Sequence, residues 1–447
     1  MPVSPARAAA FDILLRVERE SSYASDLLHS QAHERLSSAD HALATELVIG
    51  VLRWRSRLDA EVATASSLPI SKLDTEILIA LRLALYQFLW LDRVPQRAAL
   101  HESVELVKRA RKRSAAPFVN AVLRKLSAAP RNKDAASQDA SSPEAMAGAF
   151  SHPLWLVERW TRAYGLSAAL RICRYDQAIP ATAIRLCTPA AEQHLREEGV
   201  TLSPGSLLAS ARRVEAGDIT KTQAFRTGQI IIQDEASQLA AALVGHGSNI
   251  LDCCAAPGGK TLAIADQNPA AAITAVELHP HRARLLQKLM LASHSNAQIQ
   301  VINADVRHLP ISLQFDRVLA DVPCSGTGTL ARNPEIKWRL MPDDLEKLHN
   351  RQAAILRSAI AQVAAGGRLI YSTCSLEKEE NQDVVEQSLA ENHSIRLLDC
   401  RTELERLKVN GELTWADPPS LTSGPYLRTI PGVNPCDGFF AAILEQI

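Results

Sequence analysis

Two short segments of the sequence each place a cysteine among small polar residues directly after an apolar run. The first, residues 321–328, reads DVPCSGTG and holds an acid, Asp321, together with the thiol of Cys324. The second, residues 372–375, reads STCS and holds Cys374. Because the carboxyl ends of neighbouring parallel strands meet at one edge of a sheet, we expect both thiols to face the same cavity. A thiolate in such a cavity is a nucleophile that can form a covalent intermediate.

The remaining cysteines give no sign of a metal or disulfide site. The sequence holds 8 cysteines but no CxxC pair, which argues against a zinc ribbon and against a secreted disulfide framework. We therefore expect no metal site and a reducing, cytoplasmic setting. Most intracellular cysteines are small buried hydrophobic residues, and we expect that role for Cys173, Cys187, Cys253, Cys400 and Cys436.

A third segment, residues 253–261, reads CCAAPGGKT after the apolar run 250–253 and indicates a nucleotide-like ligand. Its glycines let backbone amides approach a ligand at a helix N-terminus. A phosphate-binding P-loop ends in the same Gly-Lys-Thr, but it requires a glycine where this chain has Cys254. A GxGxxG fingerprint is absent as well. Glu277 closes the next apolar run, where an acid can accept hydrogen bonds from ribose hydroxyls, so we expect adenosine without a pyrophosphate.

The elements that must position these segments alternate between apolar runs and helical stretches. Apolar runs at 250–253, 273–276, 299–302, 315–320 and 368–371 predict a doubly wound α/β sheet. Strand-like pieces at 183–186 and 229–232 lie in a mixed region upstream, and amphipathic helices fill the N-terminal part. We divide the chain into an all-α domain (1–130), a linker rich in Ala, Ser, Pro and Asp (131–150), a small α+β module (151–246) and an α/β domain (247–447).

The charge pattern favours a local binding surface for a polyanion. Lys+Arg and Asp+Glu both number 49, so the net charge alone attracts no partner. Between Glu105 and Asp134, however, the chain has no acidic residue, which suits contact with phosphates better than it suits a merely solvated helix face. The basic residues in this stretch are Lys108, Arg109, Arg111, Lys112, Arg113, Arg124, Lys125, Arg131 and Lys133.

The sequence shows no sign of membrane insertion or export. Its most apolar window, residues 77–91, is interrupted by Arg82 and Gln87, so we expect a buried core helix there. Charged residues also interrupt the N-terminal stretch, which lacks the apolar core of a signal peptide.

Two thiols and an acid beside a nucleotide-like ligand suit methylation of a pyrimidine. Carbon 5 of cytosine is a poor nucleophile until a thiolate adds to carbon 6 and pushes electron density onto it. Asp321, protonated or hydrogen-bonded, can support the charge that develops at ring nitrogen 3. After methyl transfer the proton on carbon 5 must leave, and a second thiol can assist that step. The residues alone do not decide which cysteine attacks.

The motifs CCAAPGGKT, DVPCSGTG, STCS and the terminal PCDGFF resemble those of the Sun/NOL1/NOP2 family of RNA cytosine-5 methyltransferases, over roughly residue 230 to the C-terminus. QDEAS at 233–237 and a basic-aromatic segment at 332–339 are similar as well, and we expect Lys337 and Trp338 to contact RNA. The resemblance implies a Rossmann-like class I methyltransferase domain with a mostly parallel seven-stranded sheet and S-adenosylmethionine as methyl donor. It implies that Cys374 is the nucleophile and that Cys324 aids product release.

The same resemblance implies the remaining site residues. We count Lys260 and Asp321 with the two cysteines as catalytic. Glu277 stands where the family more often has Asp, and its longer side chain can accept the same hydrogen bonds. Asp305 is expected near the adenine. The implied cofactor contacts are Cys254, Ala255, Ala256, Pro257, Gly258, Gly259, Lys260, Glu277, Asp305 and Asp321.

The helical N-terminal region resembles the NusB-type RNA-binding domain through APFVNAVLR at 116–124. With SHPLWL at 151–156, the chain resembles the bacterial Fmu/Sun branch, which implies small-subunit (16S) ribosomal RNA as substrate and cytosine 967 as target. We expect the small α+β module to bind RNA too. We further expect a monomer with no DNA or membrane partner.

Two functions from other classes stay open beside an RNA methyltransferase. A DNA cytosine-5 methyltransferase would attack with Cys324, which leaves Cys374 and the NusB-like region unexplained. A non-catalytic NusB-like scaffold would bind RNA only, which leaves the two thiols beside a cofactor loop unexplained. We therefore rank the RNA methyltransferase first.

Overall fold

The computed structural model describes residues 3–20, 22–28, 30, 36–128, 140–293, 295–309 and 314–447. Contacts divide the chain into two compact units: Met1–Ile179 with Leu330–Leu340, and Pro180–Thr329 with Met341–Ile447. The segment Leu330–Leu340 thus groups with the N-terminal unit, although the sequence placed it inside the α/β domain. Arg131 and Lys133 of the predicted basic stretch lie outside the described residues, as do positions 131–139 of the predicted linker.

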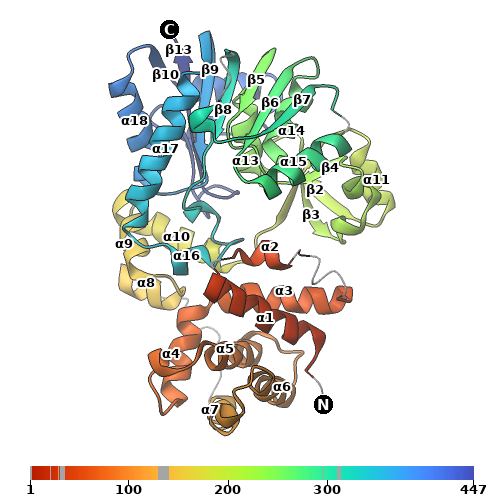
Figure 1. The fold of residues 1–447 in the computed structure, drawn as a ribbon, viewed down its shortest axis with the longest axis vertical. Coiled ribbons are helices and arrows are strands. Elements are labelled where there is room, and N and C mark those ends of the chain that lie inside the picture. The colour runs from red at the N-terminus through yellow and green to blue at the C-terminus, as the bar shows by residue number, and fades with distance from the viewer. Residues whose placement is uncertain are drawn as a thin grey trace. The chain divides into compact units, whose positions relative to one another are not determined.

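The described part of the first unit consists of helices joined by loops (Figure 1). The N-terminal ones share a single hydrophobic core, to which α1, α3, α5, α6 and α7 contribute. The elements are α1 (Pro5–Glu20), α2 (Ala24–Leu28), α3 (Ser38–Arg53), α4 (Arg55–Ala65), η2 (Ile70–Lys72), α5 (Thr75–Trp90), α6 (Gln96–Arg109), η3 (Arg113–Ala115), α7 (Ala116–Ala128), α8 (Pro143–Ala149), α9 (Leu154–Tyr164), α10 (Leu166–Gln177) and α16 (Ile336–Arg339).

Helix α5 is the buried core helix that the sequence predicted over 77–91. Its two interrupting polar residues are both buried and both satisfied. Arg82 Nε donates to Asp59 Oδ1 at 2.6 Å, and the Gln87 side chain accepts from Arg7 Nε at 2.7 Å. Hydrogen bonding offsets the cost of burying these groups. None of the described helices is long and apolar enough to cross a membrane.

Helices α8, α9 and α10 differ from the predicted division of the chain. The sequence placed α8 in a linker and α9 and α10 in the small α+β module, but all three group with the first unit. Ser151 Oγ accepts a hydrogen bond from Ser56 N at 3.1 Å, and Gln177 Nε2 donates to Arg53 O at 3.2 Å. These partners lie far apart in the sequence, so local patterning could not reveal them.

The second unit begins with a small antiparallel sheet in the order β2-β3-β1-β4. Strands β1 and β4 are the strand-like pieces predicted from the sequence, and β1 pairs antiparallel with both β3 and β4. The elements are β1 (Thr182–Leu186), α11 (Ala191–Glu197), β2 (Thr201–Pro204), β3 (Ala211–Ala216), η4 (Ile219–Lys221), α12 (Gln223–Arg226) and β4 (Ile230–Ile232).

The large sheet of the second unit contains all five strands predicted for the doubly wound fold. Its order is β11-β12-β13-β9-β8-β5-β6-β7, with β10 paired to β13, and Figure 1 shows β9, β8, β5, β6 and β7 side by side. These five strands run parallel, and β13 is antiparallel to β9. The strands are β5 (Asn249–Asp252), β6 (Ala272–Glu277), β7 (Gln298–Asn303), β8 (Phe315–Asp321), β9 (Val363–Thr373), β10 (Ile395–Leu398), β11 (Thr422–Ser423), β12 (Tyr426–Thr429) and β13 (Phe439–Gln446).

The sheet is nine-stranded in the described residues rather than seven-stranded, because β11 and β12 form a hairpin that extends the edge beyond β13. Helices α13, α14 and α19 share one core cluster with the sheet, while α17 and α18 share another. The helices and short turns are α13 (Glu235–Ala242), α14 (Gly259–Gln267), α15 (Pro280–Ala292), η5 (Val306–His308), η6 (Thr327–Thr329), α17 (Asp344–Ile360), η7 (Lys378–Glu380), α18 (Gln382–Glu391), α19 (Cys400–Val409) and η8 (Pro418–Leu421). Strands β8 and β6 flank β5 on opposite sides, which is the switch point where doubly wound sheets bind ligands.

Candidate active site

The loop between β5 and α14 carries the predicted cofactor-binding motif. Gly258 adopts φ +113°, and a Cβ there would lie 2.8 Å from the Leu286 side chain, so the position requires glycine. The loop is held by Ala255 N, which donates to Val276 O at 2.9 Å, and by Ala256 O, which accepts from Arg282. Cys254 and Pro257 belong to the same loop, and α14 begins at Gly259. The N-terminal amides of this helix are therefore available to a ligand.

Asp252, at the end of β5, is a site residue that sequence reasoning missed. Its carboxylate is buried and accepts a hydrogen bond from Thr261 Oγ1 at 2.7 Å. Burial raises the pKa of Asp252 to about 6, although the hydrogen bond from Thr261 opposes the shift. The signal that could have found it is its position, since an acid directly precedes the glycine loop at the carboxyl end of a strand.

Glu277 and Asp305 end neighbouring strands but differ in their surroundings. Glu277 is buried at the end of β6, and its Oε1 accepts from His279 N at 2.8 Å. Asp305 follows β7, and hydrogen bonds from Arg307 lower the pKa of its carboxyl to about 2. The second oxygen of Glu277 lies 3.9 Å from Arg282 Nη1, whereas Arg307 donates to both oxygens of Asp305.

Lys260 and Asp321 form an ion pair at the carboxyl edge of the sheet. Lys260 Nζ lies 2.7 Å from Asp321 Oδ2, and Ser372 Oγ donates to Asp321 Oδ1 at 2.8 Å. Burial by itself lowers the pKa of Lys260, but the charge of Asp321 and its hydrogen bond outweigh burial and raise it, and Cys374 adds to this effect. Both oxygens of Asp321 therefore have partners, so the side chain is hydrogen-bonded, which is one of the two states considered from sequence.

The two predicted thiols lie in contact, as the sequence predicted from their places after neighbouring strands. Cys324 Sγ and Cys374 Sγ are 3.3 Å apart, and all eight cysteines of the chain are free. Hydrogen bonding to Cys374, followed by burial, raises the pKa of Cys324 well above the ordinary value of a thiol. The raised pKa favours the protonated form of Cys324.

Buried polar side chains behind the thiols hold the two cysteine loops. Gly328 N donates to Cys374 O at 2.9 Å, and a Cβ on Gly328 would lie 2.2 Å from Gly438 O, so the DVPCSGTG, STCS and PCDGFF segments pack against one another. Asn381 Nδ2 donates to Ser375 O at 2.9 Å. Sequence reasoning missed Asn381 and its neighbour Glu380, although the polar run that follows STCS was a possible signal.

The predicted basic patch lies in the first unit, at the end of α6 and in the turn that follows. Three of its members already form ion pairs: Lys108 with Glu105, Arg109 with Asp12, and Lys112 with Asp74. Such exposed pairs contribute little to stability and exchange readily for other partners. Arg111 and Arg113 are exposed. The patch therefore remains accessible to phosphates.

Lys337 and Trp338, predicted to contact RNA, are held by internal contacts of the first unit. Lys337 is buried, its Nζ donates to Arg53 O at 3.0 Å, and burial lowers its pKa to about 7. The structure thus does not support direct contact of Lys337 with RNA, because its ammonium is enclosed by protein. Trp338 is half-buried, and its Nε1 donates to Leu52 O at 2.6 Å.

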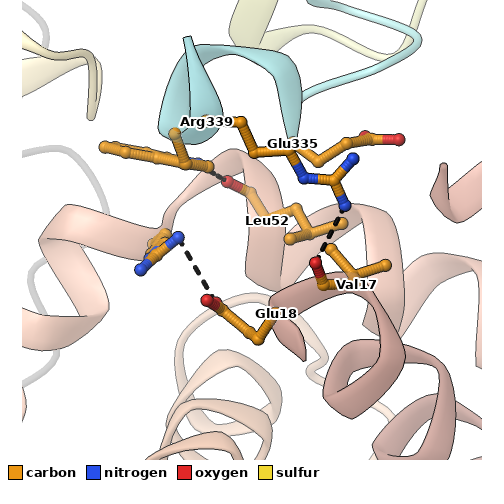
Figure 2. Close-up of a pocket in the computed structure, with 7 residues that line it drawn as sticks. Val17, Glu18, Leu52, Glu335 and Arg339 are labelled. Atoms are coloured by element: carbon orange, nitrogen blue, oxygen red, sulfur yellow. Dashed lines mark hydrogen bonds and ion pairs between the residues drawn. The ribbon is translucent and has the colours of Figure 1, made fainter. Parts of the chain in front are cut away.

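Trp338 lines a small pocket of the first unit together with Val17, Glu18, Leu52, Arg55, Glu335 and Arg339. Figure 2 shows the guanidinium of Arg339 directed at the backbone of Val17, where Nη2 donates to the carbonyl at 2.9 Å. Arg55 Nη1 lies 3.3 Å from Glu18 Oε1. Arg339 and Trp338 thus bind the Leu330–Leu340 segment to α1 and α3, while Arg55 and Glu18 pair with each other.

Family models match the two parts of the chain. The model described as 16S rRNA methyltransferase RsmB/F matches residues 241–445, and the NusB family model matches residues 4–128. Among the described residues, no group of three or more His, Cys, Asp or Glu side chains could hold a metal ion.

Curated relatives match over nearly the whole length. The chain is 34% identical over 409 residues to a probable ribosomal RNA small subunit methyltransferase B of Bacillus subtilis, covering 88% of this chain and 90% of the relative. It is 30% identical to the ribosomal RNA small subunit methyltransferase B of Vibrio cholerae, covering 98% and 97%.

Solved structures share the fold. PH0851 superposes with a TM-score of 0.80 at 22% identity over all of both chains. A methyltransferase homolog protein from Pyrococcus horikoshii has a TM-score of 0.57 at 24% identity, covering 69% of this chain and 100% of that one.

Fold and site together define a Rossmann-like methyltransferase joined to a NusB-like helical domain. The chain belongs to the ribosomal RNA small subunit methyltransferase B family, and its activity is methyl transfer to ribosomal RNA.

Proposed function

We propose that the protein transfers a methyl group from S-adenosylmethionine to carbon 5 of a cytosine in 16S ribosomal RNA, through a covalent adduct with Cys374. The observation that carries this proposal is the contact of the two thiols, with Sγ atoms 3.3 Å apart, at the sheet edge that also holds the Lys260–Asp321 pair. Methylation of an exocyclic or ring nitrogen needs no thiol nucleophile, whereas methylation of carbon 5 does.

The residues around the loop after β5 fit S-adenosylmethionine. Glu277 offers a carboxylate oxygen to ribose hydroxyls, and the N-terminal amides of α14 face the same edge. Gln233 Oε1 is buried without a hydrogen-bond partner, while its Nε2 would lie 3.3 Å from a Cβ on Gly259, so this side chain has an acceptor free beside the loop. Bound there, S-adenosylmethionine supplies an electrophilic methyl group. Cys254, Ala255, Ala256 and Pro257 form the remaining wall, and Asp305 would join it on leaving Arg307.

Cys374 begins the chemistry by adding to the base. Its sulfur forms a bond to carbon 6 of cytosine, and the electrons of the 5,6 double bond move onto carbon 5 and toward ring nitrogen 3. Asp321, with Lys260 beside it, accepts hydrogen bonds from the polar edge of the base and fixes its orientation. Burial opposes the shift, but the charge of Asp321 and, after it, that of Cys374 raise the pKa of Lys260, so the ammonium keeps its charge while Cys374 attacks.

Cys324 assists the last step, in which product leaves. Once carbon 5 carries the methyl group, its proton must be removed, the sulfur–carbon 6 bond must break, and the double bond must form again. Cys324 Sγ lies 3.3 Å from Cys374 Sγ, the sulfur whose bond to carbon 6 must break. Because its pKa is raised, Cys324 still carries a proton at this stage. It gives that proton to the Cys374 sulfur as the sulfur–carbon 6 bond breaks, and the thiolate that this leaves on Cys324 accepts the proton from carbon 5, so both cysteines end as thiols.

The substrate assignment rests on the NusB-like unit and on the relatives. Small-subunit ribosomal RNA is named in the relatives' descriptions, and the exposed basic patch after α6 supplies phosphate contacts. A DNA methyltransferase or a scaffold explains neither the thiol pair nor this combination of domains. Free cysteines suit a reducing cytoplasm, and we propose that the protein acts as a monomer.

Methylcytosine mapping by bisulfite sequencing tests the function. A strain that lacks the gene should lose one methylcytosine from 16S ribosomal RNA, and wild-type protein should restore it. Cys374→Ala should not restore it, whereas Cys187→Ala, which removes a thiol from the small sheet, should. Restoration by Cys374→Ala would rule out the proposed nucleophile, and an unchanged methylcytosine pattern in the deletion strain would rule out the proposed substrate.

A further inference from the structure

We propose that Glu380 is a positioning residue that clamps the two cysteine loops together and fixes which thiol attacks. This inference rests on the proposed function, because it concerns the same pair of thiols. Glu380 lies at the end of η7 and was not among the residues expected to act in the site. It is completely buried, with 0% of its surface exposed.

The clamp consists of donors from both loops on one carboxylate. Ser325 N donates to Glu380 Oε1 at 2.8 Å, and Ser375 Oγ donates to Glu380 Oε2 at 2.5 Å. Ser325 Oγ donates to Oε2 as well, and it lies 3.0 Å from Ser375 Oγ. Since Ser325 follows Cys324 and Ser375 follows Cys374, one side chain joins the residues next to both thiols.

Helix α17 completes the arrangement. Gln352 Nε2 donates to Glu380 Oε1 at 2.9 Å and to Pro323 O at 3.0 Å, which ties the carboxylate to the residue before Cys324. The carboxylate thus receives hydrogen bonds from four neutral groups: one backbone amide, two hydroxyls and one side-chain amide. These donors satisfy the buried carboxylate and fix its position between the two loops.

The negative charge of this clamp acts on the thiol of Cys324. After the hydrogen bond to Cys374, burial and the charge of Cys374, the carboxylate of Glu380 is a further cause of the raised pKa of Cys324. Glu380 therefore helps to keep the proton on Cys324 before the attack. Geometry and charge act in the same direction: the clamp holds the thiols in contact and leaves Cys374 as the nucleophile.

Glu380→Gln separates the charge from the contacts. The glutamine carbonyl can still accept from Ser325 N and Gln352, and its NH2 group can donate to the serine hydroxyls, which accept as well as donate. The fold should therefore survive, which thermal melting checks. The matched control is Glu386→Gln, the same substitution at an exposed carboxylate on α18.

The decisive readout is alkylation of the individual cysteines by iodoacetamide as a function of pH, followed by mass spectrometry on the full-length protein. With Glu380→Gln, the pH midpoint for alkylation of Cys324 should move down, because one of the charges that raise its pKa is removed. With Glu386→Gln it should not move. Methylation by Glu380→Gln should fall more than its folded fraction does.

The alkylation results test the proposed clamp independently of methylation activity. A Cys324 midpoint that stays at the wild-type pH in folded Glu380→Gln overturns the proposal, even if the enzyme methylates RNA as proposed. Should that variant fail to fold, Ser325→Ala and Ser375→Ala together remove both hydroxyl donors and keep the charge. An unchanged ratio of Cys374 to Cys324 alkylation in that double variant would also overturn the clamp. If instead the midpoint shifts while wild-type protein forms no methylcytosine, the clamp stands and the proposed function fails.

Discussion

Replacement of Glu277 by alanine should weaken binding of S-adenosylmethionine by one charged hydrogen-bonding interaction. The carboxylate is buried at the end of β6, with Oε1 fixed by His279 N at 2.8 Å and Oε2 3.9 Å from Arg282. One oxygen is thus engaged within the protein, and the other is left for the ribose. Loss of a hydrogen bond to a charged group costs about 1.5–3 kcal/mol. Since 1.36 kcal/mol corresponds to a factor of ten, the dissociation constant should rise roughly 10- to 150-fold.

Titration calorimetry with S-adenosylmethionine measures this change directly. Glu277→Gln is the matched variant, because its carbonyl can still accept from His279 N while the negative charge is gone, so its affinity should fall between those of wild type and Glu277→Ala. Thermal melting confirms that both variants fold. Wild-type affinity in folded Glu277→Ala would refute the placement of the ribose at β6.

Two further predictions concern RNA binding and stability. Reversal of the basic patch to glutamates should weaken RNA binding and flatten its salt dependence in filter-binding titrations. The reversed residues are Lys108, Arg109, Arg111, Lys112 and Arg113. Lys337→Met should leave the salt slope unchanged, because the Lys337 ammonium is buried. An unaltered slope after reversal would make the patch a solvated surface. Asp252 has a folded-state pKa of about 6, above its ordinary 3.8, so the folded protein binds this proton more tightly and the free energy of unfolding falls as pH rises through that interval. Asp252→Asn should remove a fall of about 2 kcal/mol between pH 4 and pH 7 in urea denaturation, and a fall as large as that of wild type would contradict the raised pKa.

The sequence predicted the parts of the molecule whose geometry depends on neighbours along the chain. All five parallel strands were expected near their observed positions, and the contact of Cys324 with Cys374 followed from their places after β8 and β9. Gly258 was expected in a loop that lets backbone approach a ligand, and its positive φ agrees with this. Strand periodicity and turn chemistry are local properties, which is why they can be read directly.

What the sequence did not predict depends on partners far away in the chain. Lys337 reads as an RNA-binding cation, yet it is buried against Arg53 because the Leu330–Leu340 segment groups with the N-terminal helices. Asp305 was expected near the adenine, yet its carboxylate accepts a hydrogen bond from Arg307. Glu380 lies in an acidic run that resembles a solvated turn, and only the structure shows that donors from two loops and α17 meet on it. No local sequence pattern specifies such long-range contacts.

The covalent adduct on Cys374 is tested most directly by a denaturing gel with labelled 16S ribosomal RNA and S-adenosylmethionine. Cys374→Ala should bind RNA yet form no denaturant-resistant complex, since no thiolate remains to add to carbon 6. Cys324→Ala should accumulate such a complex, because the adduct forms but is resolved slowly, and Cys187→Ala should behave as wild type. A trapped complex with Cys374→Ala, and none with Cys324→Ala, would contradict the central claim and assign the attack to Cys324.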